Sequence, residues 1–545
     1  MWERKLDYNY QQLFPYPETR DSQEQAIEFA LDSLIAKDKK FVIIEAGTGV
    51  GKSAIGYTVA KYTDHNRTKP PMEEYENGSY FLTTQKILQD QYVKDFGTRG
   101  MFSIKSSSNY TCKHNSENTC AESGRALRTA EKGSKFWNTC VFKCPYKIAK
   151  SEFISSRLGV TNFSYFLAET TYAGKLKPRN VLVIDEAHNI ETELSKFVEI
   201  TVTDRFASRL LKLPMPDLRT QLQAFNWIND VYAPKLKSHV KHMEAMLDKY
   251  TGLKEKLKEF VTIARQYELL DKHMCKVNRF LEIYNHDNWV YNQIPPEGRS
   301  GKKIEFKPID VSPYADDMLF KFGEKVIMMS ATILNKDAFC EVLGIKPDQA
   351  EFISLPSPFP VKNRPIMAFP IGKMSHKEID TSLPKLAQAV KEILANHKGE
   401  KGIIHCHTFK IANYIKRNVR SSRLLIHNSE NREAVLKEHI KSKKDSVLLS
   451  PSMTEGVDLV DDASRFQIIC KVPYPYLGDK LVKKRMNKWS WWYPLQTAKT
   501  IVQATGRSIR NENDHAVTYI LDSDWDRFFQ RNRSLFPKSF KECIK

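Results

Sequence analysis

The stretch that decides the fold is FVIIEAGTGVGKS, residues 41–53. Its apolar start is typical of a buried strand, its Gly-rich middle indicates a turn, and the amphipathic pattern that begins at Ala54 predicts a helix. Backbone N–H groups can wrap a polyphosphate only where side chains do not obstruct them, and a helix N-terminus attracts anions. The stretch therefore predicts a phosphate-binding loop, although a Gly-rich turn that happens to precede a lysine is the alternative.

Each residue of this loop has an expected role. Lys52 supplies a mobile cation for the outer phosphates, and the Ser53 hydroxyl binds Mg²⁺. Ala46 stands at the first position of the pattern, where Gly is usual. The residues expected to contact the nucleotide are Ala46, Gly47, Thr48, Gly49, Val50, Gly51, Lys52 and Ser53.

Two further apolar runs follow along the chain. Residues 80–84 (YFLTT) predict a second buried strand, and residues 181–184 predict a third that ends in Asp185-Glu186-Ala187-His188. Carboxylates at the end of a buried strand are costly unless they serve a cation or a reaction. We expect Asp185 to hold Mg²⁺ through water and Glu186 to polarise the attacking water. The order of these elements predicts an α/β nucleotide hydrolase with a mainly parallel sheet.

The composition narrows the class of partner. The chain has 545 residues and a formal charge of +19, which favours a polyanionic partner such as nucleic acid. No stretch approaches the length of a membrane-spanning helix, and the N-terminus lacks the apolar core of a signal peptide. We therefore expect no membrane partner and a cytoplasmic or nucleoid-associated location.

Four of the nine cysteines cluster in one segment, at positions 112, 120, 140 and 144. Only the last two form a close pair, whereas zinc ribbons usually have two close pairs. A [4Fe–4S] cluster also takes four thiolates and tolerates uneven spacing. Spacing alone leaves the cluster and zinc open, His114 keeps a mixed zinc site open, and four unliganded cysteines are a third alternative. The same segment interleaves Lys and Arg with aromatic residues, including Tyr110, as a single-strand contact would; these rings are otherwise the core of a small subdomain.

The second half of the chain is organised differently. Residues 206–291 carry the periodicity of amphipathic helices, broken near Gly252. After a polar break at 356–360, the runs 402–407, 447–450 and 467–472 predict a second α/β unit. Near its end, Gln503 precedes Arg507 and Arg510, which share one helix face and can point into one phosphate site.

At this point the residues resemble a known family. AGTGVGKS, DEAH at 185–188, SAT at 330–332, TEGVDL at 454–459 and QATGRSIR at 503–510 are similar to the ordered motifs of superfamily 2 helicases. The four cysteines between the first two motifs, and DEAHNIE in place of plain DEAH, resemble the XPD/DinG branch. The resemblance covers essentially the whole chain, and the helical segment is matched least securely.

The resemblance implies an α/β fold of two RecA-like P-loop motor domains, the first of which carries an iron–sulfur domain and a helical arch as insertions. The expected ranges are 1–98, 161–205 and 301–350 for motor domain 1, 99–160 for the iron–sulfur domain, 206–300 for the arch and 351–545 for motor domain 2. The implied cluster ligands are Cys112, Cys120, Cys140 and Cys144.

The resemblance also implies residue roles. Nucleotide and catalytic roles fall on Gln23, Lys52, Ser53, Asp185, Glu186, Gly456, Asp458, Gln503, Arg507 and Arg510. Without the resemblance, the sequence does not distinguish two interpretations of Gln23: a side-chain amide that hydrogen-bonds to adenine, or an exposed polar residue at the start of a helix. His188, Ser330 and Thr332 match positions that couple hydrolysis to movement, and Thr83, Thr84 and Thr454 match positions near the DNA backbone.

The implied function is that of an ATP- and Mg²⁺-dependent helicase that moves 5′ to 3′ on single-stranded DNA and unwinds forked or 5′-tailed duplexes as a monomer. A nucleic-acid-binding ATPase that remodels or signals without separating strands is the alternative. A P-loop enzyme of small molecules would leave the +19 charge without an explanation. Pathway, protein partners and the choice between DNA and RNA–DNA duplexes stay open.

Overall fold

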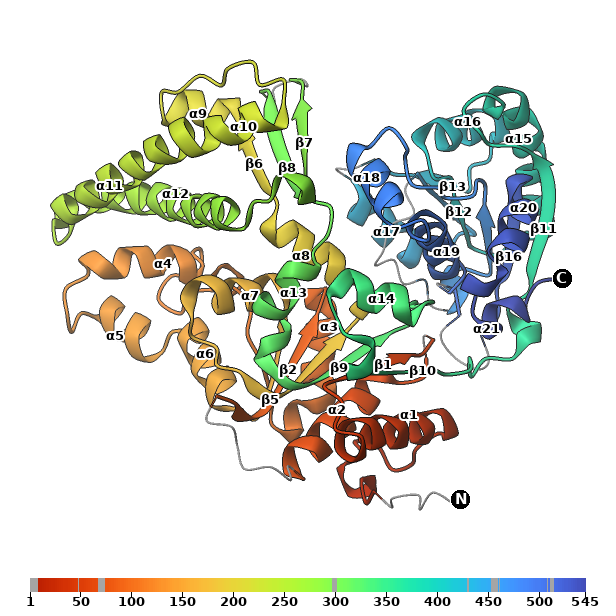
Figure 1. Ribbon diagram of the computed structural model, residues 1–545, viewed down its shortest axis with the longest axis horizontal. Coiled ribbons are helices and arrows are strands. Elements are labelled where there is room, and N and C mark those ends of the chain that lie inside the picture. Colours follow the sequence, from red (N-terminus) through yellow and green to blue (C-terminus); the bar gives the residue numbers. More distant parts are fainter. Residues whose placement is uncertain are drawn as a thin grey trace.

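The computed structural model describes residues 8–47, 49–66, 74–296, 301–428, 431–451, 459, 461–506, 508–509 and 514–545. The described chain forms two parallel sheets that lie side by side, with two insertions extending from the first (Figure 1). Thr48, Thr454, Gly456, Asp458, Arg507 and Arg510, which the motifs assign to the site, lie outside the described residues.

The first sheet has seven strands, and every pairing in it is parallel. Their order is β10 (Ala350–Ser354), β1 (Phe41–Glu45), β9 (Gly323–Ser330), β5 (Arg179–Asp185), β2 (Glu76–Thr83), β4 (Leu158–Asn162) and β3 (Met101–Ser103). The runs at 41–44, 80–84 and 181–184 are thus strands, as their apolar character predicted. Since β10 belongs to this sheet, motor domain 1 continues to Ser354, beyond the expected boundary at 350.

Helices cover both faces of this sheet because its strands alternate apolar side chains between two cores. One core contains Val42, Phe81 and Val183 and is closed by α1 (Asp21–Leu31), α2 (Lys52–His65) and α3 (Lys86–Phe96). The other contains Ile43, Leu82 and Ile184 and is closed by α7 (Phe163–Ala168), α8 (Ile190–Val198), α13 (Ser312–Met318) and α14 (Lys336–Leu343).

The cysteine segment is built from short helices. After β3 the chain forms α4 (Cys120–Ala126), α5 (Lys135–Phe142) and α6 (Pro145–Ser155) before it returns to the sheet in β4. These helices lie beyond the edge of the first sheet (Figure 1). Since β3 and β4 pair within that sheet, the insertion is slightly shorter than the expected range 99–160.

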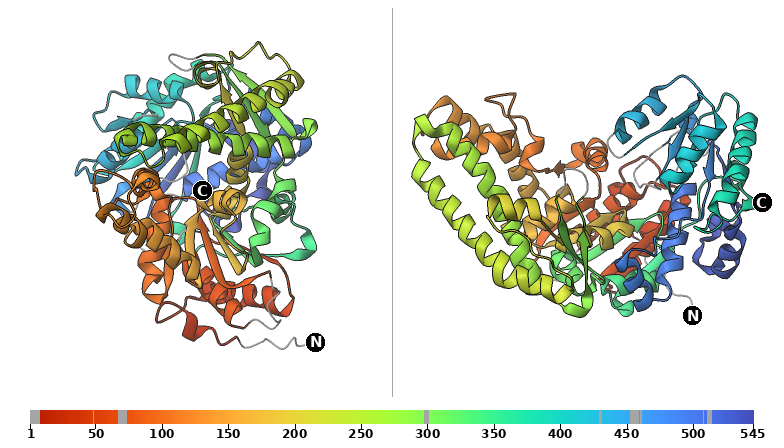
Figure 2. Two further views of the ribbon diagram at one scale, coloured as in Figure 1. Left: turned by 90° about the vertical axis from the view of Figure 1, so that its left-hand side faces the viewer. Right: turned by 90° about the horizontal axis from the view of Figure 1, so that it is seen from above.

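The second insertion is an arch of two long antiparallel helices on a small sheet. Its helices are α9 (Asp204–Leu210), α10 (Gln221–Trp227), α11 (Ala233–Tyr250) and α12 (Leu257–Ile283), and the two longest separate at Gly252, where φ is +85°. The base is an antiparallel sheet of β6 (Ile200–Thr203), β8 (Lys303–Pro308) and β7 (Trp289–Ile294). The helical periodicity predicted α11 and α12, but these strands were not expected. Figure 2 shows the long helices extending over the cysteine segment.

The second parallel sheet forms motor domain 2. Its order is β11 (Ile366–Gly372), β16 (Val517–Asp522), β15 (Phe466–Ile469), β12 (Gly402–His405), β14 (Val447–Ser450) and β13 (Leu424–Ile426). Its helices are α15 (Ile379–Asn396), α16 (Phe409–Val419), α17 (Arg432–Lys441), α18 (Lys480–Lys488), α19 (Trp492–Thr505), α20 (Asp524–Arg531) and α21 (Lys538–Lys541). No helix among the described residues is both long and apolar enough to cross a membrane.

Candidate active site

The phosphate-binding loop joins β1 to α2 at the carboxyl edge of the first sheet. Gly49 and Gly51 have φ of +82° and +85°, a region that residues with a Cβ rarely adopt. A Cβ on Gly51 would also lie 2.5 Å from Nε2 of Gln23. Lys52 begins α2, and its ammonium group donates to the Ala46 carbonyl at 3.2 Å. The loop therefore has the conformation that exposes N–H groups to an anion, with Lys52 folded back over it and Ser53 in the first helical turn.

Helix α1 supports this loop from behind. Gln23 is buried, accepts from the Arg20 N–H at 3.0 Å and donates to the Val50 carbonyl at 3.0 Å. Arg20 donates to the Gly49 carbonyl at 2.9 Å. In this structure the Gln23 amide is thus a loop-positioning group. The contact of Arg20 was not predicted, because nothing in the helix-start sequence distinguishes it from a surface cation.

The acidic motif follows β5, two strands away from β1 in the sheet. Asp185 is buried, accepts from the Glu186 N–H at 2.9 Å and accepts from the hydroxyl of Tyr92 at 3.2 Å. Burial raises the pKa of Asp185, and the nearby charge of Lys52 and the two hydrogen bonds offset part of this effect. A carboxylate that lacks full solvation beside a lysine is suited to a metal ion held by phosphates. The contact between Tyr92 and Asp185 was not predicted from the sequence.

A continuous set of polar contacts runs from the acidic motif to motor domain 2. Glu186 has φ of +53° and places Oε2 3.3 Å from Nδ1 of His188, which lies 2.8 Å from the Ser330 hydroxyl. Oγ of Ser330 accepts from the Thr332 N–H at 3.1 Å, and the Ser330 carbonyl accepts from the Ala46 N–H at 2.8 Å. These contacts join the acidic motif, the SAT motif and the phosphate-binding loop.

The last contact in this set crosses between the domains. Gln503, near the end of α19, donates from Nε2 to Oγ1 of Thr332 at 3.1 Å. Thr505 at the same helix end accepts from Gln467 in β15 at 2.9 Å, which fixes α19 to the second sheet. His188, Ser330 and Thr332 were predicted to couple hydrolysis to movement, and Gln503 was predicted to act at the nucleotide; the structure brings the four into one contact path.

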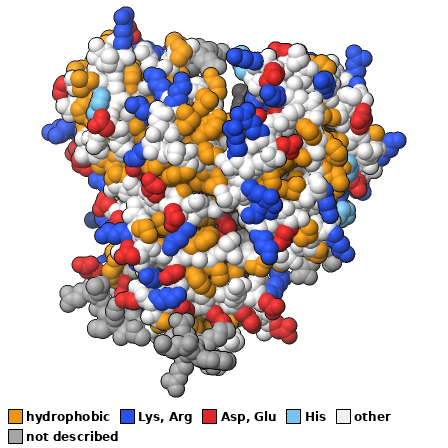
Figure 3. Space-filling model, turned by 45° about the vertical axis from the view of Figure 1, so that its right-hand side comes forward, with side chains coloured by type: hydrophobic (Ala, Val, Ile, Leu, Met, Phe, Trp, Pro, Cys, Tyr) orange, Lys and Arg blue, Asp and Glu red, His pale blue; other side chains and the backbone are white. Residues whose placement is uncertain are grey.

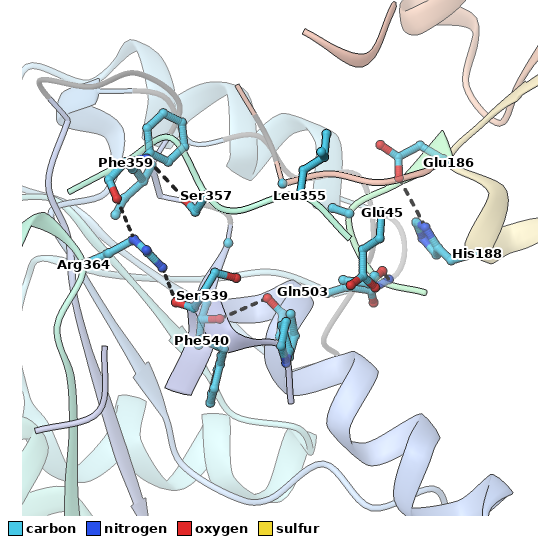
Figure 4. A pocket seen from close by; sticks show the side chains of 18 of the residues that line it. Glu45, Glu186, His188, Leu355, Ser357, Phe359, Arg364, Gln503, Ser539 and Phe540 are labelled. Atoms are coloured by element: carbon cyan, nitrogen blue, oxygen red, sulfur yellow. Dashed lines mark hydrogen bonds and ion pairs between the residues drawn. The ribbon is translucent and has the colours of Figure 1, made fainter. Parts of the chain in front are cut away.

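A cavity of about 520 Å³ separates the two domains at this level. Gly47, Glu186 and Thr332 line it from motor domain 1, and Gln503 and Gly506 line it from motor domain 2. Figure 4 shows Glu186 beside His188 on one side, with Gln503 reaching toward the same space. Glu45 also lines this cavity and accepts from the Ser354 hydroxyl at 2.8 Å. That role was not predicted, since Glu45 stood only as the end of an apolar strand.

The described residues that were expected to contact nucleic acid differ in their exposure and do not form one surface. Thr83 is fully buried and donates its hydroxyl to the Gln85 carbonyl at 3.1 Å, whereas Thr84 lines the interdomain cavity. The Tyr110 hydroxyl accepts from the Lys105 N–H at 3.2 Å, and its ring packs 5.7 Å from that of Tyr146. In this structure Thr83 and Tyr110 act in packing.

The four clustered cysteines meet at a second cavity, of about 230 Å³. All four are buried and come from different elements: Cys112 precedes α4, Cys120 begins it, Cys140 lies in α5, and Cys144 caps α6. Their side chains line one space, whereas His114 does not line it and packs its ring 5.1 Å from that of Phe136. Among the residues that the structure describes, no three His, Cys, Asp or Glu side chains converge on one metal-ion position.

The thiols differ in their surroundings. Burial raises the pKa of Cys140 to about 11, with a further contribution from Cys112. Burial also acts to raise the pKa of Cys112, but hydrogen bonds from Ser123 and from the backbone of Asn115 and His114 outweigh it, so its pKa is lowered. Backbone donors of this kind stabilise a thiolate.

Two parallel sheets that face one cavity, with a phosphate-binding loop on the first and Gln503 on the second, define a P-loop nucleotide hydrolase with two RecA-like domains. Residues 16–213 match the family described as "Type III restriction enzyme, res subunit", and residues 391–543 match the "Helicase C-terminal domain".

Curated relatives and solved structures narrow this class. A probable ATP-dependent helicase of Methanocaldococcus jannaschii is 23% identical and aligns over 97% of this chain and 95% of its own. The ATP-dependent DNA helicase DinG of Photobacterium profundum is 26% identical over 42% of this chain and 36% of its own. The XPD helicase structure superimposes with a TM-score of 0.64 at 15% identity, covering 97% of this chain and 100% of its own. Xpd4 of S. tokodaii gives 0.58 at 16%, covering 96% and 99%. The family matches, the relatives and the shared fold together support an XPD/DinG-like superfamily 2 helicase, of the ATP-dependent DNA helicase family.

Proposed function

We propose that this protein couples ATP hydrolysis in the interdomain cavity to 5′-to-3′ movement along single-stranded DNA and to unwinding of the duplex ahead. The observation that carries the proposal is the contact path from Glu186 through His188, Ser330 and Thr332 to Gln503. Because this path joins the residue suited to activate water with a helix of the other domain, a change at the nucleotide alters a contact between domains. Such a contact is what a motor requires.

The hydrolytic step follows from the placement of the site residues. The loop amides and Lys52 would hold the phosphates, and Ser53 and Asp185 would hold Mg²⁺. Glu186, which lines the cavity, would take the proton of the attacking water as its oxygen bonds to the γ-phosphorus, while the bond from that phosphorus to the bridging oxygen breaks and ADP leaves. Arg507 and Arg510 would neutralise the charge that develops on the transferred group when the domains close. Their role, and those of Thr454, Gly456 and Asp458, is proposed from the motif resemblance.

The charge of the surface supports a nucleic-acid track. The chain carries a net charge of +19, and Figure 3 shows Lys and Arg side chains gathered beside apolar side chains on one face. Cations that contact phosphates next to apolar surface that contacts bases suit a single strand. Single-stranded DNA and forked or 5′-tailed duplexes are the proposed substrates. Of Thr83 and Thr84, only Thr84 lines the interdomain cavity.

A [4Fe–4S] cluster is the proposed occupant of the cysteine cavity. Four buried thiols line one space of about 230 Å³, and a [4Fe–4S] cluster takes four thiolates. Cys112, Cys120, Cys140 and Cys144 would hold it. When bound, it would cross-link three short helices that have little core of their own, so that the domain could stand rigidly where strands divide.

The direct test is strand displacement from a forked DNA with a labelled strand, in the presence of ATP, ADP or no nucleotide. We expect strand displacement from a fork with a 5′ tail when ATP is present, and none with ADP or without nucleotide. Single-stranded DNA should also stimulate ATP hydrolysis. DNA-stimulated hydrolysis without displacement would instead support the ATPase that remodels or signals. An iron and sulfide assay after anaerobic purification tests the cluster, and zinc in its place would contradict that part.

A further inference from the structure

The segment from α18 to α19 is shared between two hydrophobic cores. Trp489, just after α18, and Trp492, the first residue of α19, are buried in the core of motor domain 1 and the arch. Ala498, Ile501 and Ala504, further along the same helix, are buried in the core of motor domain 2. In Figure 1, α18 lies between the arch base and the second sheet. Helix α19 therefore packs into the cores of both motor domains.

Helix α18 contacts the base of the arch through Lys480, Arg485 and Lys488, and we call these contacts the grip. Lys480 donates to the Tyr291 carbonyl of β7 at 3.3 Å, and Lys488 contacts the Asp310 carboxylate at 2.6 Å, just after β8. Asp310 is itself fixed, because its N–H donates to Oδ1 of Asn288 at 3.0 Å. These contacts thus reach β7 and the chain just after β8, both on the return path from the arch helices to motor domain 1.

Arg485 is the centre of this grip. Its guanidinium donates to the Ile309 carbonyl at 2.9 Å and the Pro308 carbonyl at 3.4 Å, and it lies 2.6 Å from the Glu191 carboxylate. Only 11% of the Arg485 side chain and 14% of the Glu191 side chain are exposed. A bonded charge pair that is this well shielded has a defined geometry, unlike an exposed pair.

Glu191 links this grip to the hydrolytic site. It lies in the first turn of α8, the helix that directly follows the acidic motif. The other end of α19 carries Gln503, which contacts Thr332 beside the nucleotide cavity. Helix α19 has 14 residues and is therefore about 21 Å long. Both ends of the α18–α19 segment are thus tied to elements of the hydrolytic site.

We propose that the α18–α19 segment transmits the nucleotide state to the arch base, and that Arg485 and Glu191 are the positioning residues that couple the two. This inference rests on the proposed function, because a change at the arch base affects activity only if the protein separates DNA strands. Neither Arg485 nor Glu191 lines the nucleotide cavity. Their loss should therefore spare hydrolysis and interrupt its effect on the arch.

The experiment is hydrogen exchange of the full-length protein with ADP and with a non-hydrolysable ATP analogue. In the wild type, the analogue should change exchange at the nucleotide loop and also at residues 289–294 and 303–310. In Arg485→Met the change at the loop should persist and the change at the arch base should disappear. No response at the arch base in the wild type, or an equal response in the variant, would overturn the proposal.

Two further variants keep this test interpretable. Glu191→Gln retains shape and removes the charge, so it should reproduce the effect even where Arg485→Met folds poorly. The matched control is Arg279→Met, which removes a cation of the arch base that pairs with Asp317 at 2.9 Å but is not part of the grip of α18. It should respond to nucleotide as the wild type does.

Unwinding and hydrolysis supply a second readout. Arg485→Met and Glu191→Gln should keep DNA-stimulated ATP hydrolysis within about twofold and lower the unwinding rate at least about fivefold. If the wild type does not unwind, the proposed function fails while the exchange experiment still decides the transmission. If the wild type unwinds and both variants unwind equally well, the transmission fails while the proposed function stands.

Discussion

The nucleotide cavity and the cysteine cavity are built by opposite means. Around the first, β1, β5 and β9 end at one sheet edge, where backbone pairing positions Asp185 and Ser330, and Lys52 begins the helix that follows β1. Around the second, three short helices bring four cysteines together over an insertion with few buried side chains besides them. The comparison teaches that the first site is organised by the fold, whereas the second has little packing of its own and, on our proposal, depends on the cluster for its order. The predictions that follow test this difference.

The largest effect is expected at the nucleotide loop. Lys52→Ala should lower ATP hydrolysis by at least about a hundredfold, because the cation at the outer phosphates is lost where charge develops. Stability and circular dichroism should stay close to the wild type, since the sheet holds the loop. The matched control is Lys61→Ala in the same helix, whose ammonium contacts the Tyr57 hydroxyl at 3.2 Å. Equal activity losses in both variants would contradict the assignment.

At the cysteine cavity, Cys140→Ser should remove bound iron while the motor domains remain folded. Because the insertion has little core of its own, we expect protease sites within 104–157 to open in this variant. Iron analysis and limited proteolysis are the measurements. Cys275→Ser in α12, a cysteine outside the cavity, should keep the iron and the protection. An unchanged cleavage pattern without iron would mean that the insertion is organised by its own packing.

The arch should be the acid-sensitive part of the molecule. His273 lies 2.9 Å from the Tyr232 hydroxyl, and burial lowers its pKa to about 4. The unfolded chain takes up this proton near pH 6.5, so folding loses up to about 3 kcal/mol as pH falls from about 6.5 to about 4. Thermal melts across this range should show less pH dependence in His273→Gln. An identical pH profile in that variant would exclude His273 as the cause.

The smallest effect is expected from a backbone change at the loop. Gly51→Ala should cost about 1–2 kcal/mol of stability, since alanine is strained at φ +85° and its Cβ meets Gln23. Nucleotide affinity should fall with it. Gly97→Ala, at φ −60° with its nearest new contact at 3.5 Å, should be close to neutral. Denaturant melts of the two variants compare them, and equal stability would argue against a strained loop.

The sequence predicted the nucleotide site better than the cysteine site. The loop at 46–53, the acidic motif at 185–188 and the SAT motif at 330–332 could be located because strand periodicity and strand ends are local signals. The roles of Arg20, Glu45 and Tyr92 could not, because each depends on a contact with a residue far away in the sequence. Position in a motif also did not foretell burial, as Thr83 shows.

The arch and the cysteine segment show the limits of periodicity. Steps of three and four predicted α11 and α12, whereas β6 and β8 are short, with 4 and 6 residues, and β6 lies far from its partner β8 in sequence. The four cysteine positions could be read from sequence, but spacing did not distinguish a cluster from zinc. The packing of the His114 ring against Phe136, away from the cavity, is a tertiary contact that spacing cannot encode.

One measurement tests the central claim most directly: ATP hydrolysed and strands separated, followed together on a 5′-tailed duplex, for the wild type and Cys140→Ser. We predict that the wild type does both and that the variant hydrolyses ATP on DNA without separating strands, because its sheet-built site survives the loss of the cluster. A variant that separates strands as fast as the wild type, or a wild type that separates none, would contradict the account.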